Sequence, residues 1–380
     1  MTTATKTLLK TPFHAFHVEQ GARMVDFAGW DMPLLYSSIL EEHRQVRTSG
    51  GFFDVSHMGR VRFSGRHARK FLDRVCTRRI LGMEKGQCRY SLVCNERGGC
   101  RDDVLVYAID EDEFLMVCNA SNRAKLLEHF AAQKADMTFS MKDETESTAM
   151  VALQGPRVME VIGRFSREVP TLKRYRFAQK NLLVIKLLVS RTGYTGEDGV
   201  EVILPGGMMA RQALKLMLDA DGTGAGLLKP AGLGARDSLR LEAGMPLYGH
   251  EIDEEVDPLT AGLDFAVNLD KGVGEDRAGR FIGQEALEKI KAQGLSRRLV
   301  GLRLAGRRSA RQGMSVLAAG RPVGRVTSGC LSPTLDVPIA MAIVEVGSAA
   351  IGTSLEIDLG RERATAEVVP LPFYKAPPAK

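Results

Sequence analysis

The segment "CNERGGCRDDVLVYAIDEDEFLMVCN" (residues 94–119) predicts an antiparallel hairpin. An apolar run ends at Cys94, a Gly-Gly turn follows, and a second strand begins at Val104. Asp102 and Asp103 stand where that second strand starts, although aspartate is depleted in strands. Two adjacent carboxylates at this position indicate a role beyond strand formation.

Outward from the hairpin, residues 88–119 predict a three-strand meander that turns at "NERGG" and at "DEDE". A helix is expected over 121–133. An earlier helix, capped by Ser37 or Ser38, is expected to end near Gly50.

The rest of the chain divides into two patterns. Residues 146–204 predict strands with a helix starting near Pro156, and helical periodicity returns in "GGMMARQALKLMLDA" and "LGARDSLRLEAGM". From about residue 298, short strands and Gly/Pro turns predict an all-β C-terminal domain. Strand–helix alternation without long parallel-type apolar strands indicates α+β for the first two-thirds.

Length and composition set the class of protein. The chain has 380 residues, more than one hydrophobic core usually supports, so two or three domains are expected. It is 44% hydrophobic and 26% charged, which is typical of a soluble globular protein. No apolar stretch approaches a membrane span, and the first residues contain no hydrophobic signal core, so we expect a cytoplasmic protein without membrane contact.

The cysteines and histidines predict no metal site. None of the six cysteines forms a C-x-x-C pair, and reduced, partly buried thiols are expected. The seven histidines are scattered; His14 and His17 share a helical face, but no third ligand lies near them in the sequence.

The net charge of +6 is unevenly distributed. Residues 59–79 carry eight lysines and arginines against Asp73 alone. Ala68, Phe71, Leu72 and Val75 follow helical spacing there, so the arginines are expected on the solvent face of an amphipathic helix. The stretch has little aromatic interleaving and no recognisable nucleic-acid module, which leaves a solvated face or a surface for an anionic ligand or acidic protein.

Two further segments contain polar residues whose role the sequence leaves open. In "SRTGYTGEDGVEVIL" (190–204), strand alternation places Glu201 on the same face as Ile203. From the residues alone, Glu201 is equally a solvent-facing strand residue, and Tyr194 a packing aromatic. Arg236 stands one helical turn before Arg240, which by itself predicts a surface lattice of salt bridges.

Seven motifs occur in the order of a known family. They are "GARMVDFAGWDMPL" (21–34), "GFFDVSHMGR" (51–60), "RYSLVCNERGGCRDD" (89–103), "ALQGP" (152–156), "SRTGYTGEDGVEV" (190–202), "AGLGARDSLRLEAGMPLYGHEID" (231–253) and "TSGCLSPTLDVPIAMA" (327–342). From about residue 11 onward the chain closely resembles the aminomethyltransferases of the glycine cleavage system, the T-protein family.

This resemblance implies a tetrahydrofolate-dependent enzyme. Such an enzyme takes the aminomethyl group from the lipoyl sulfur of lipoylated H-protein, releases ammonia, and gives 5,10-methylenetetrahydrofolate and dihydrolipoyl H-protein. No metal, flavin or nucleic acid is implied, and a monomer is expected.

The resemblance also implies a three-domain cloverleaf with folate in its central channel. A discontinuous folate-binding domain would comprise residues 1–57 and 148–275 and would surround an inserted ferredoxin-like α/β domain of residues 58–147. Residues 276–380 would form a C-terminal distorted jelly-roll β-barrel.

The family's site residues map onto this sequence one by one. The catalytic aspartate corresponds to Asp103, whose carboxylate would stabilise positive charge as ammonia leaves. Glu201 matches the residue that grips the pterin, because a carboxylate suits two adjacent N–H donors in a planar fork. The other folate-binding positions match Tyr90, Asn119, Tyr194 and Arg236.

Two departures from the family pattern stand out. Cys100 and Arg101 replace two aliphatic residues, which is expected to change the solvent face of the turn and the approach of the H-protein. Lys375 stands where a related bacterial pattern has arginine, which weakens the case for a C-terminal contact to the folate tail.

Other functions remain open at this point. Dimethylsulfoniopropionate demethylase shares the expected fold, as do folate modules of dimethylglycine- and sarcosine-oxidising enzymes, whose flavin domain finds no room in this chain. A folate-binding iron–sulfur assembly protein would carry a Lys-Gly-Cys-Tyr-type motif, and residues 245–329 contain no cysteine. A nucleic-acid-binding module is supported by charge alone.

Overall fold

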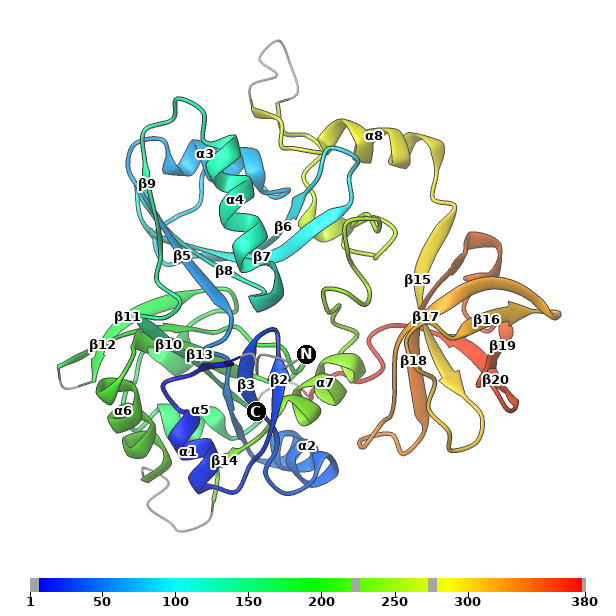
Figure 1. Cartoon of the computed structure of the whole chain (residues 1–380), viewed down its shortest axis with the longest axis horizontal. Helices are drawn as coiled ribbons and strands as arrows, with labels where there is room; N and C mark the ends of the chain where they lie inside the picture. The colour runs from blue at the N-terminus through cyan, green and yellow to red at the C-terminus, as the bar shows by residue number, and fades with distance from the viewer. Residues whose placement is uncertain (1–6, 183, 220–225, 273–278, 378–380) are drawn as a thin grey trace, which may run out of the picture. The chain divides into compact units, whose positions relative to one another are not determined.

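The computed structural model describes residues 7–182, 184–219, 226–272 and 279–377 (Figure 1). The described chain forms two compact units. The first unit lies within Met1–Val61 and Asp143–Asp237, and the second comprises Arg62–Lys142 and Ser238–Pro377. Each unit therefore combines segments that are far apart in the sequence.

The first unit is built on a six-stranded sheet in the order β11-β12-β13-β10-β4-β14, beside a small sheet in the order β1-β3-β2. The larger sheet is antiparallel except for the β14–β4 pair. The strands are β1 (Leu9–Lys10), β2 (Arg23–Phe27), β3 (Trp30–Leu35), β4 (Gly51–Asp54), β10 (Thr148–Gln154), β11 (Phe177–Leu182), β12 (Ile185–Ser190), β13 (Gly199–Pro205) and β14 (Lys229–Pro230).

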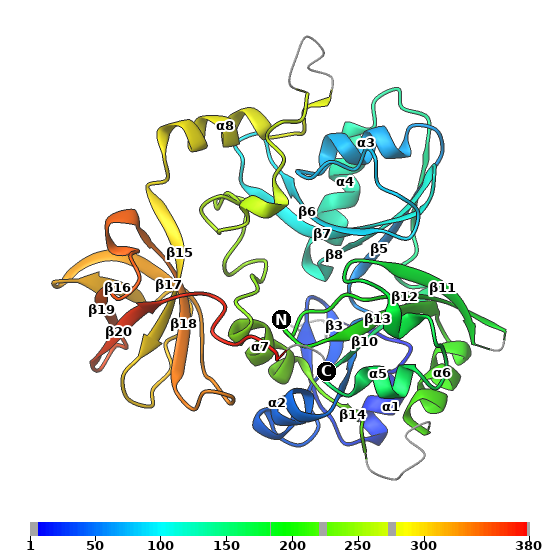
Figure 2. The same cartoon turned by 180° about the vertical axis from the view of Figure 1, so that it is seen from behind.

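Helices pack on this larger sheet and close the core of the first unit, as both views show (Figures 1 and 2). They are α1 (His14–Glu19), α2 (Ile39–Thr48), α5 (Val158–Ile162) and α6 (Met208–Asp219). Alternate residues of β10 and β13, such as Val151 and Val202, pack with Ala210 and Ala213 of α6 in one buried cluster. Burial of this apolar area is the main favourable contribution to folding of the unit.

The second unit begins with a mixed α/β segment. Its five-stranded sheet has the order β6-β7-β8-β5-β9, and α3 and α4 lie over it (Figure 1). The elements are β5 (Gly59–Ser64), α3 (Ala68–Val75), β6 (Cys88–Cys94), β7 (Cys100–Asp110), β8 (Glu113–Cys118), a 3-10 turn η1 (Ala120–Asn122), α4 (Arg123–Gln133) and β9 (Ser140–Asp143). The predicted meander over 88–119 is confirmed.

A closed six-stranded barrel completes the second unit, with the order β15-β18-β17-β16-β19-β20. Its strands are β15 (Arg297–Leu304), β16 (Ser315–Ala318), β17 (Arg321–Leu331), β18 (Pro338–Glu345), β19 (Ser354–Asp358) and β20 (Arg363–Val369), and they follow α8 (Gln284–Gln293). Small and branched residues, including Ala340, Ala342 and Val344, fill the barrel interior. The mixed α/β class and the C-terminal barrel are therefore confirmed.

The predicted helices also form. Ser38, not Ser37, is the N-cap of α2, because its hydroxyl accepts the backbone N–H of Glu41 at 3.2 Å. The helix predicted near Pro156 is α5, and "LGARDSLRLEAGM" contains α7 (Leu233–Glu242).

The basic stretch of residues 59–79 is only partly a solvent face. Its helix is α3, whose four predicted apolar positions are all fully buried. Arg60 was expected among the wet arginines, and this prediction is wrong. Its side chain is 0% exposed and donates to the carbonyls of Ser56, Met58 and Thr145, which offsets the cost of burying its charge.

Three expectations about composition can be compared with the described residues. All six cysteines are free thiols and five of them are buried, as expected. No described helix has the length and hydropathy needed to cross a membrane. Among the described residues, no group of three or more His, Cys, Asp or Glu side chains has an arrangement suited to a metal ion.

Candidate functional site

The two acids of the opening segment lie inside a strand and not at its start. β7 begins at Cys100, and Asp102 and Asp103 pair with Val93 and Leu92 of β6. The ladder of backbone hydrogen bonds with β6 therefore outweighs the low strand propensity of aspartate.

Strand alternation sends the two carboxylates to opposite faces of the sheet. Asp102 is 0% exposed, whereas Asp103 is half-buried. The hydroxyl of Tyr90, two residues from Asp103's partner on β6, donates to Asp103 Oδ2 at 3.2 Å. The ring of Tyr90 stacks on Phe265 with 6.0 Å between ring centres, and Phe265 is 64% exposed. Tyr90 therefore holds Asp103 on a face that is open to a ligand.

Asn119, just after β8, connects the two acids. Its Nδ2 group donates to Asp102 Oδ1 at 2.8 Å and to Asp103 Oδ1 at 2.7 Å. Its backbone N–H donates to Asp102 Oδ2 at 3.0 Å, and Asn122 Nδ2 donates to Asp102 Oδ1 at 2.6 Å. We refer to Tyr90, Asp102, Asp103, Asn119 and Asn122 as the paired-acid cluster.

The protonation of these acids is coupled. Burial and the nearby charge of Asp103 raise the pKa of Asp102, although the amides of Asn122 and Asn119 act in the opposite direction. Burial also raises the pKa of Asp103, and Asn119 and Tyr90 oppose that rise. Ionising one of two neighbouring carboxyl groups makes it harder to ionise the other, so the two acids titrate as a coupled pair.

A second group of predicted residues lies in the first unit. Glu201 of β13 is buried, with 8% of its surface exposed, and its Oε2 accepts the Thr192 hydroxyl at 2.6 Å. The Ser190 hydroxyl oxygen lies 2.7 Å from the Thr192 hydroxyl oxygen. Glu201 is therefore an inward-facing residue on β13, which answers the question left open by the sequence.

Arg236 of α7 lies beside this glutamate and Tyr194. Its guanidinium carbon is 4.8 Å from the centre of the Tyr194 ring, a cation–π distance. Burial lowers the pKa of Arg236, while the charge of Glu201 raises it. Arg236 Nη1 is buried and finds no hydrogen-bond acceptor among the described residues. A buried donor without an acceptor is costly, so this atom fits a ligand oxygen.

The predicted salt-bridge lattice around Arg236 and Arg240 is wrong. Arg240 is buried and pairs with Glu251 at 2.8 Å and with the Ser328 hydroxyl at 2.8 Å. Glu242 accepts from Ser332 and Thr334. These charged side chains hold parts of the second unit together because they are buried with partners.

His57 is a residue of the first unit that sequence reasoning missed. Its ring is 3% exposed, packs edge-on against Phe27, and its Nδ1 finds no partner among the described residues. Burial, with smaller effects from Arg236 and Arg60, lowers the pKa of His57 to about 3, against the charge of Asp54. The imidazole is therefore neutral at physiological pH. Its place in "DVSHMGR" was the only available signal.

Little in the sequence indicates that three other residues, Asn122, Thr192 and Phe265, belong to these clusters. Asn122 and Thr192 are polar residues next to predicted motif positions, but their hydrogen bonds to Asp102 and Glu201 depend on the tertiary structure. Phe265 lies about 175 positions after Tyr90, and only folding brings the two rings together.

The sequence departures can now be placed. Cys100 was expected to change the solvent face of the turn, and this is wrong, because Cys100 is fully buried opposite Cys94. Arg101 is half-buried, within 3.6 Å of Glu96 and 3.7 Å of Glu254. Lys375 is exposed.

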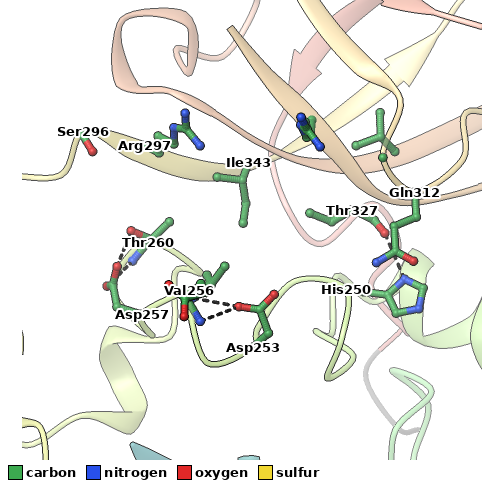
Figure 3. Close-up of a pocket in the computed structure, with 14 residues that line it drawn as sticks. His250, Asp253, Val256, Asp257, Thr260, Ser296, Arg297, Gln312, Thr327 and Ile343 are labelled. Atoms are coloured by element: carbon green, nitrogen blue, oxygen red, sulfur yellow. Dashed lines mark hydrogen bonds between the residues drawn. The ribbon is translucent and has the colours of Figure 1, made fainter. Parts of the chain in front are cut away.

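A separate cavity of about 500 Å³ lies in the second unit, between residues 250–260 and the outside of the barrel (Figure 3). His250 Nδ1 meets the Thr327 carbonyl at 3.0 Å, and the Asp253 carboxylate accepts the backbone N–H of Val256 at 3.0 Å. The residues lining this cavity include none of the predicted site residues. Of the acids that line it, Asp253 and Asp257 accept backbone N–H groups of chain turns and Glu255 pairs with Arg97, so we do not assign the site to this cavity.

Comparison with known proteins covers nearly the whole chain. Residues 13–271 match the family described as GCVT N-terminal domain, and residues 297–375 match the glycine cleavage T-protein C-terminal barrel domain. A protein named aminomethyltransferase from Rubrobacter xylanophilus is 45% identical over 370 residues, covering 97% of this chain and 95% of the relative. One of the same name from Symbiobacterium thermophilum is 43% identical over 379 residues, covering 98% and 99%.

A solved structure is also similar. The crystal structure of glycine cleavage system aminomethyltransferase T from Bartonella henselae has a TM-score of 0.88 and 31% sequence identity to this chain. The match covers 98% of this chain and all of that one.

Proposed function

Because the chain belongs to the aminomethyltransferase (glycine cleavage T-protein) family, we propose that it transfers the aminomethyl carbon of lipoylated H-protein to tetrahydrofolate. The products are ammonia, 5,10-methylenetetrahydrofolate and dihydrolipoyl H-protein. Full-length similarity to relatives of that name supports this reaction above other folate chemistries of the same fold.

The observation that carries the proposal is the geometry of Asp103. Its carboxylate lies on the open face of β7, fixed by Tyr90 at 3.2 Å and by Asn119 at 2.7 Å. A fixed carboxylate is suited to a transition state in which positive charge develops, because it needs little reorganisation during the reaction.

In the proposed reaction, N5 of tetrahydrofolate forms a bond to the methylene carbon and the bond from that carbon to the amino group breaks. N10 then forms the second bond to the carbon as the carbon–sulfur bond breaks. The two folate N–H protons end on ammonia and on the lipoyl thiol. Asp103 stabilises the cationic carbon as ammonia leaves and orients the attacking nitrogen.

The residues of the first unit are proposed to bind the folate. Glu201 has one oxygen engaged by Thr192, and each carboxylate oxygen has a further lone pair for the pterin N–H groups. Arg236 offers its unpartnered Nη1 to a folate oxygen, and Tyr194 holds the guanidinium in place. Tyr90 and Asn119 are proposed as folate contacts beside Asp103.

Other properties belong to the same proposal. The sequence predicts a cytoplasmic monomer that needs neither metal nor flavin, with a discontinuous folate-binding domain, an inserted domain and the barrel. Folate in a central channel likewise stays a prediction.

The direct test is to mix the purified protein with aminomethyl-loaded H-protein and tetrahydrofolate, and to measure ammonia and methylenetetrahydrofolate. We expect both products in equal amounts, and neither when tetrahydrofolate is left out. A demethylase of this fold would instead form methyltetrahydrofolate from dimethylsulfoniopropionate. Such a product, with no ammonia from loaded H-protein, would overturn the proposal.

A further inference from the structure

The Asp102 side chain is fixed by both burial and hydrogen bonds. It lies on the face of β7 opposite Asp103, fully buried, and accepts hydrogen bonds from three N–H donors. Two of the three donors come from Asn119, one from its side chain and one from its backbone. Asp102 therefore controls the position of Asn119 more than that of any other residue in the cluster.

The acids also decide which way the Asn119 amide points. One end of that amide meets Asp102 Oδ1 at 2.8 Å, Asp103 Oδ1 at 2.7 Å and the Asp103 carbonyl at 3.4 Å. Three oxygens surround this end, and it is assigned as the NH₂ group because the Asp103 backbone carbonyl can only accept a hydrogen bond. The Asn119 Oδ1 atom accepts no hydrogen bond within the described part of the chain.

We infer that Asp102 is a positioning residue which, through Asn119, presents a fixed hydrogen-bond acceptor beside Asp103. This inference rests on the proposed function and adds to it a second polar group at the reacting carbon. The acceptor suits an N–H of the substrate, either on the folate or on the departing amine. Asp103 supplies the charge, and Asn119 supplies the directional contact that aligns the N–H group next to it.

Charged and titratable groups surround Asp102 on several elements. Asp103 is on the same strand, and the charge of Asp102 acts on Tyr248, which the Lys125 ammonium contacts at 2.8 Å. Lys125 also pairs with Glu254 at 2.8 Å. None of these groups replaces the two hydrogen bonds from Asn119 to Asp102. Asp102→Asn, in which an NH₂ group replaces one of the two acceptor oxygens, should therefore loosen the Asn119 amide.

A double-mutant cycle tests this inference, with turnover and tetrahydrofolate affinity measured for Asp102→Asn, Asn119→Ala and the double variant. If Asp102 acts through Asn119, losses of about tenfold and thirtyfold in turnover should combine to about thirtyfold, and not to about three-hundredfold. Asn122→Ala is the control, because it removes a donor to the same carboxylate without releasing Asn119. It should lower turnover less than threefold.

A measurement that needs no catalysis separates this inference from the proposed function. In ¹⁵N NMR spectra of the unliganded protein, the Asn119 side-chain amide, assigned from its loss in Asn119→Ala, should exchange slowly with water. The signals should also move as the acid pair titrates. Fast exchange in the wild type, unchanged signals in Asp102→Asn, or additive losses in the cycle would each overturn the role of Asp102. Failure of the wild type to release ammonia would instead overturn the proposed function.

Discussion

At the residue scale, Asp103 is the side chain on which turnover should depend most. Replacing it by asparagine keeps the shape but removes the charge, which should raise the barrier by about 3 kcal/mol and slow turnover by roughly a hundredfold. Tetrahydrofolate should still bind, which calorimetry would show. Asp102→Asn is the matched neighbour and should cost much less. Turnover of Asp103→Asn within threefold of wild type would remove this residue from the mechanism.

Glu201 should determine folate affinity. In Glu201→Gln an N–H₂ group replaces one acceptor, so a buried ligand donor loses its partner and binding should weaken by about 1–3 kcal/mol. Isothermal calorimetry with tetrahydrofolate measures this change. Glu160→Gln, on the exposed face of α5, is the control and should bind as the wild type does. Equal affinities for the two variants would contradict the assignment.

The raised pKa of Asp102 makes a prediction about stability. Burial and the charge of Asp103 favour the protonated acid in the folded state. Its contribution is therefore fully present below about pH 4, where an unfolded aspartate ionises, and is lost as pH rises toward the raised folded pKa. The free energy of unfolding should fall with pH by up to about 1.4 kcal/mol per unit relative to Asp102→Asn.

Denaturant unfolding of both proteins at pH 5, 6.5 and 8 checks this difference. Asp102→Asn should become relatively more stable as the pH rises. Parallel pH dependence of the two proteins would mean that Asp102 is ionised in the folded state over this whole range.

At the element scale, α2 illustrates how a helix boundary is set. Its cap is Ser38, whose hydroxyl accepts the Glu41 N–H, while Glu42 of the first turn accepts the backbone N–H groups of Tyr36 and Ser37. These bonds provide partners for the Glu41 N–H in the first turn and for the N–H groups of two residues that precede the helix.

We expect Ser38→Ala to lower the free energy of unfolding of the first unit by about 1 kcal/mol, the usual cost of losing a cap. Ser37→Ala is the control, because the Ser37 side chain is exposed and makes no capping bond. Thermal unfolding followed by circular dichroism compares the two. A larger loss of stability in Ser37→Ala than in Ser38→Ala would contradict the assignment of Ser38 as the cap.

At the scale of the whole molecule, the net charge of +6 should affect the encounter with the protein donor. If the basic stretch of residues 59–79 is a surface for an acidic protein, Arg66, Arg69 and Lys70 are the steering residues expected from the sequence. The structure changes that set, because the Arg69 guanidinium lies 5.0 Å from the centre of the Phe114 ring and donates to the Met83 carbonyl. The exposed residues around α3 are Arg66, Lys70 and Arg74.

Replacing Arg66, Lys70 and Arg74 together by glutamate should slow transfer from H-protein several-fold at low salt. The reason is that attraction between this basic face and an acidic partner raises the encounter rate. The defect should shrink as salt rises, since the screening length is about 10 Å at 0.1 M. Kinetics with loaded H-protein at several ionic strengths measure it, with tetrahydrofolate affinity unchanged. Lys186, Arg211 and Lys215, exposed in the first unit, form a charge-matched control triple. Equal slowing by both triple variants would mean that the encounter rate depends on the net charge of the protein and not on the face around α3.

Local patterns in the sequence determined most of the elements. The alternation in residues 88–119 and the helical spacing of Ala68, Phe71, Leu72 and Val75 predicted strands and a helix that the structure contains. The Gly/Pro-punctuated C-terminal region predicted an all-β domain, which the structure contains as a closed barrel. These features follow from neighbouring residues, because backbone periodicity decides which side chains share a face. The ordered motifs likewise identified the family.

Only the tertiary structure decided what the polar groups do. Arg60 became a buried support, Arg240 paired with Glu251, and Asn119 came to connect two acids on opposite faces of one strand. Each outcome depends on partners brought together by folding, since a buried charge or amide is tolerated only where donors and acceptors meet it in the right geometry. Sequence spacing carries no information on that geometry when the partners lie far apart along the chain.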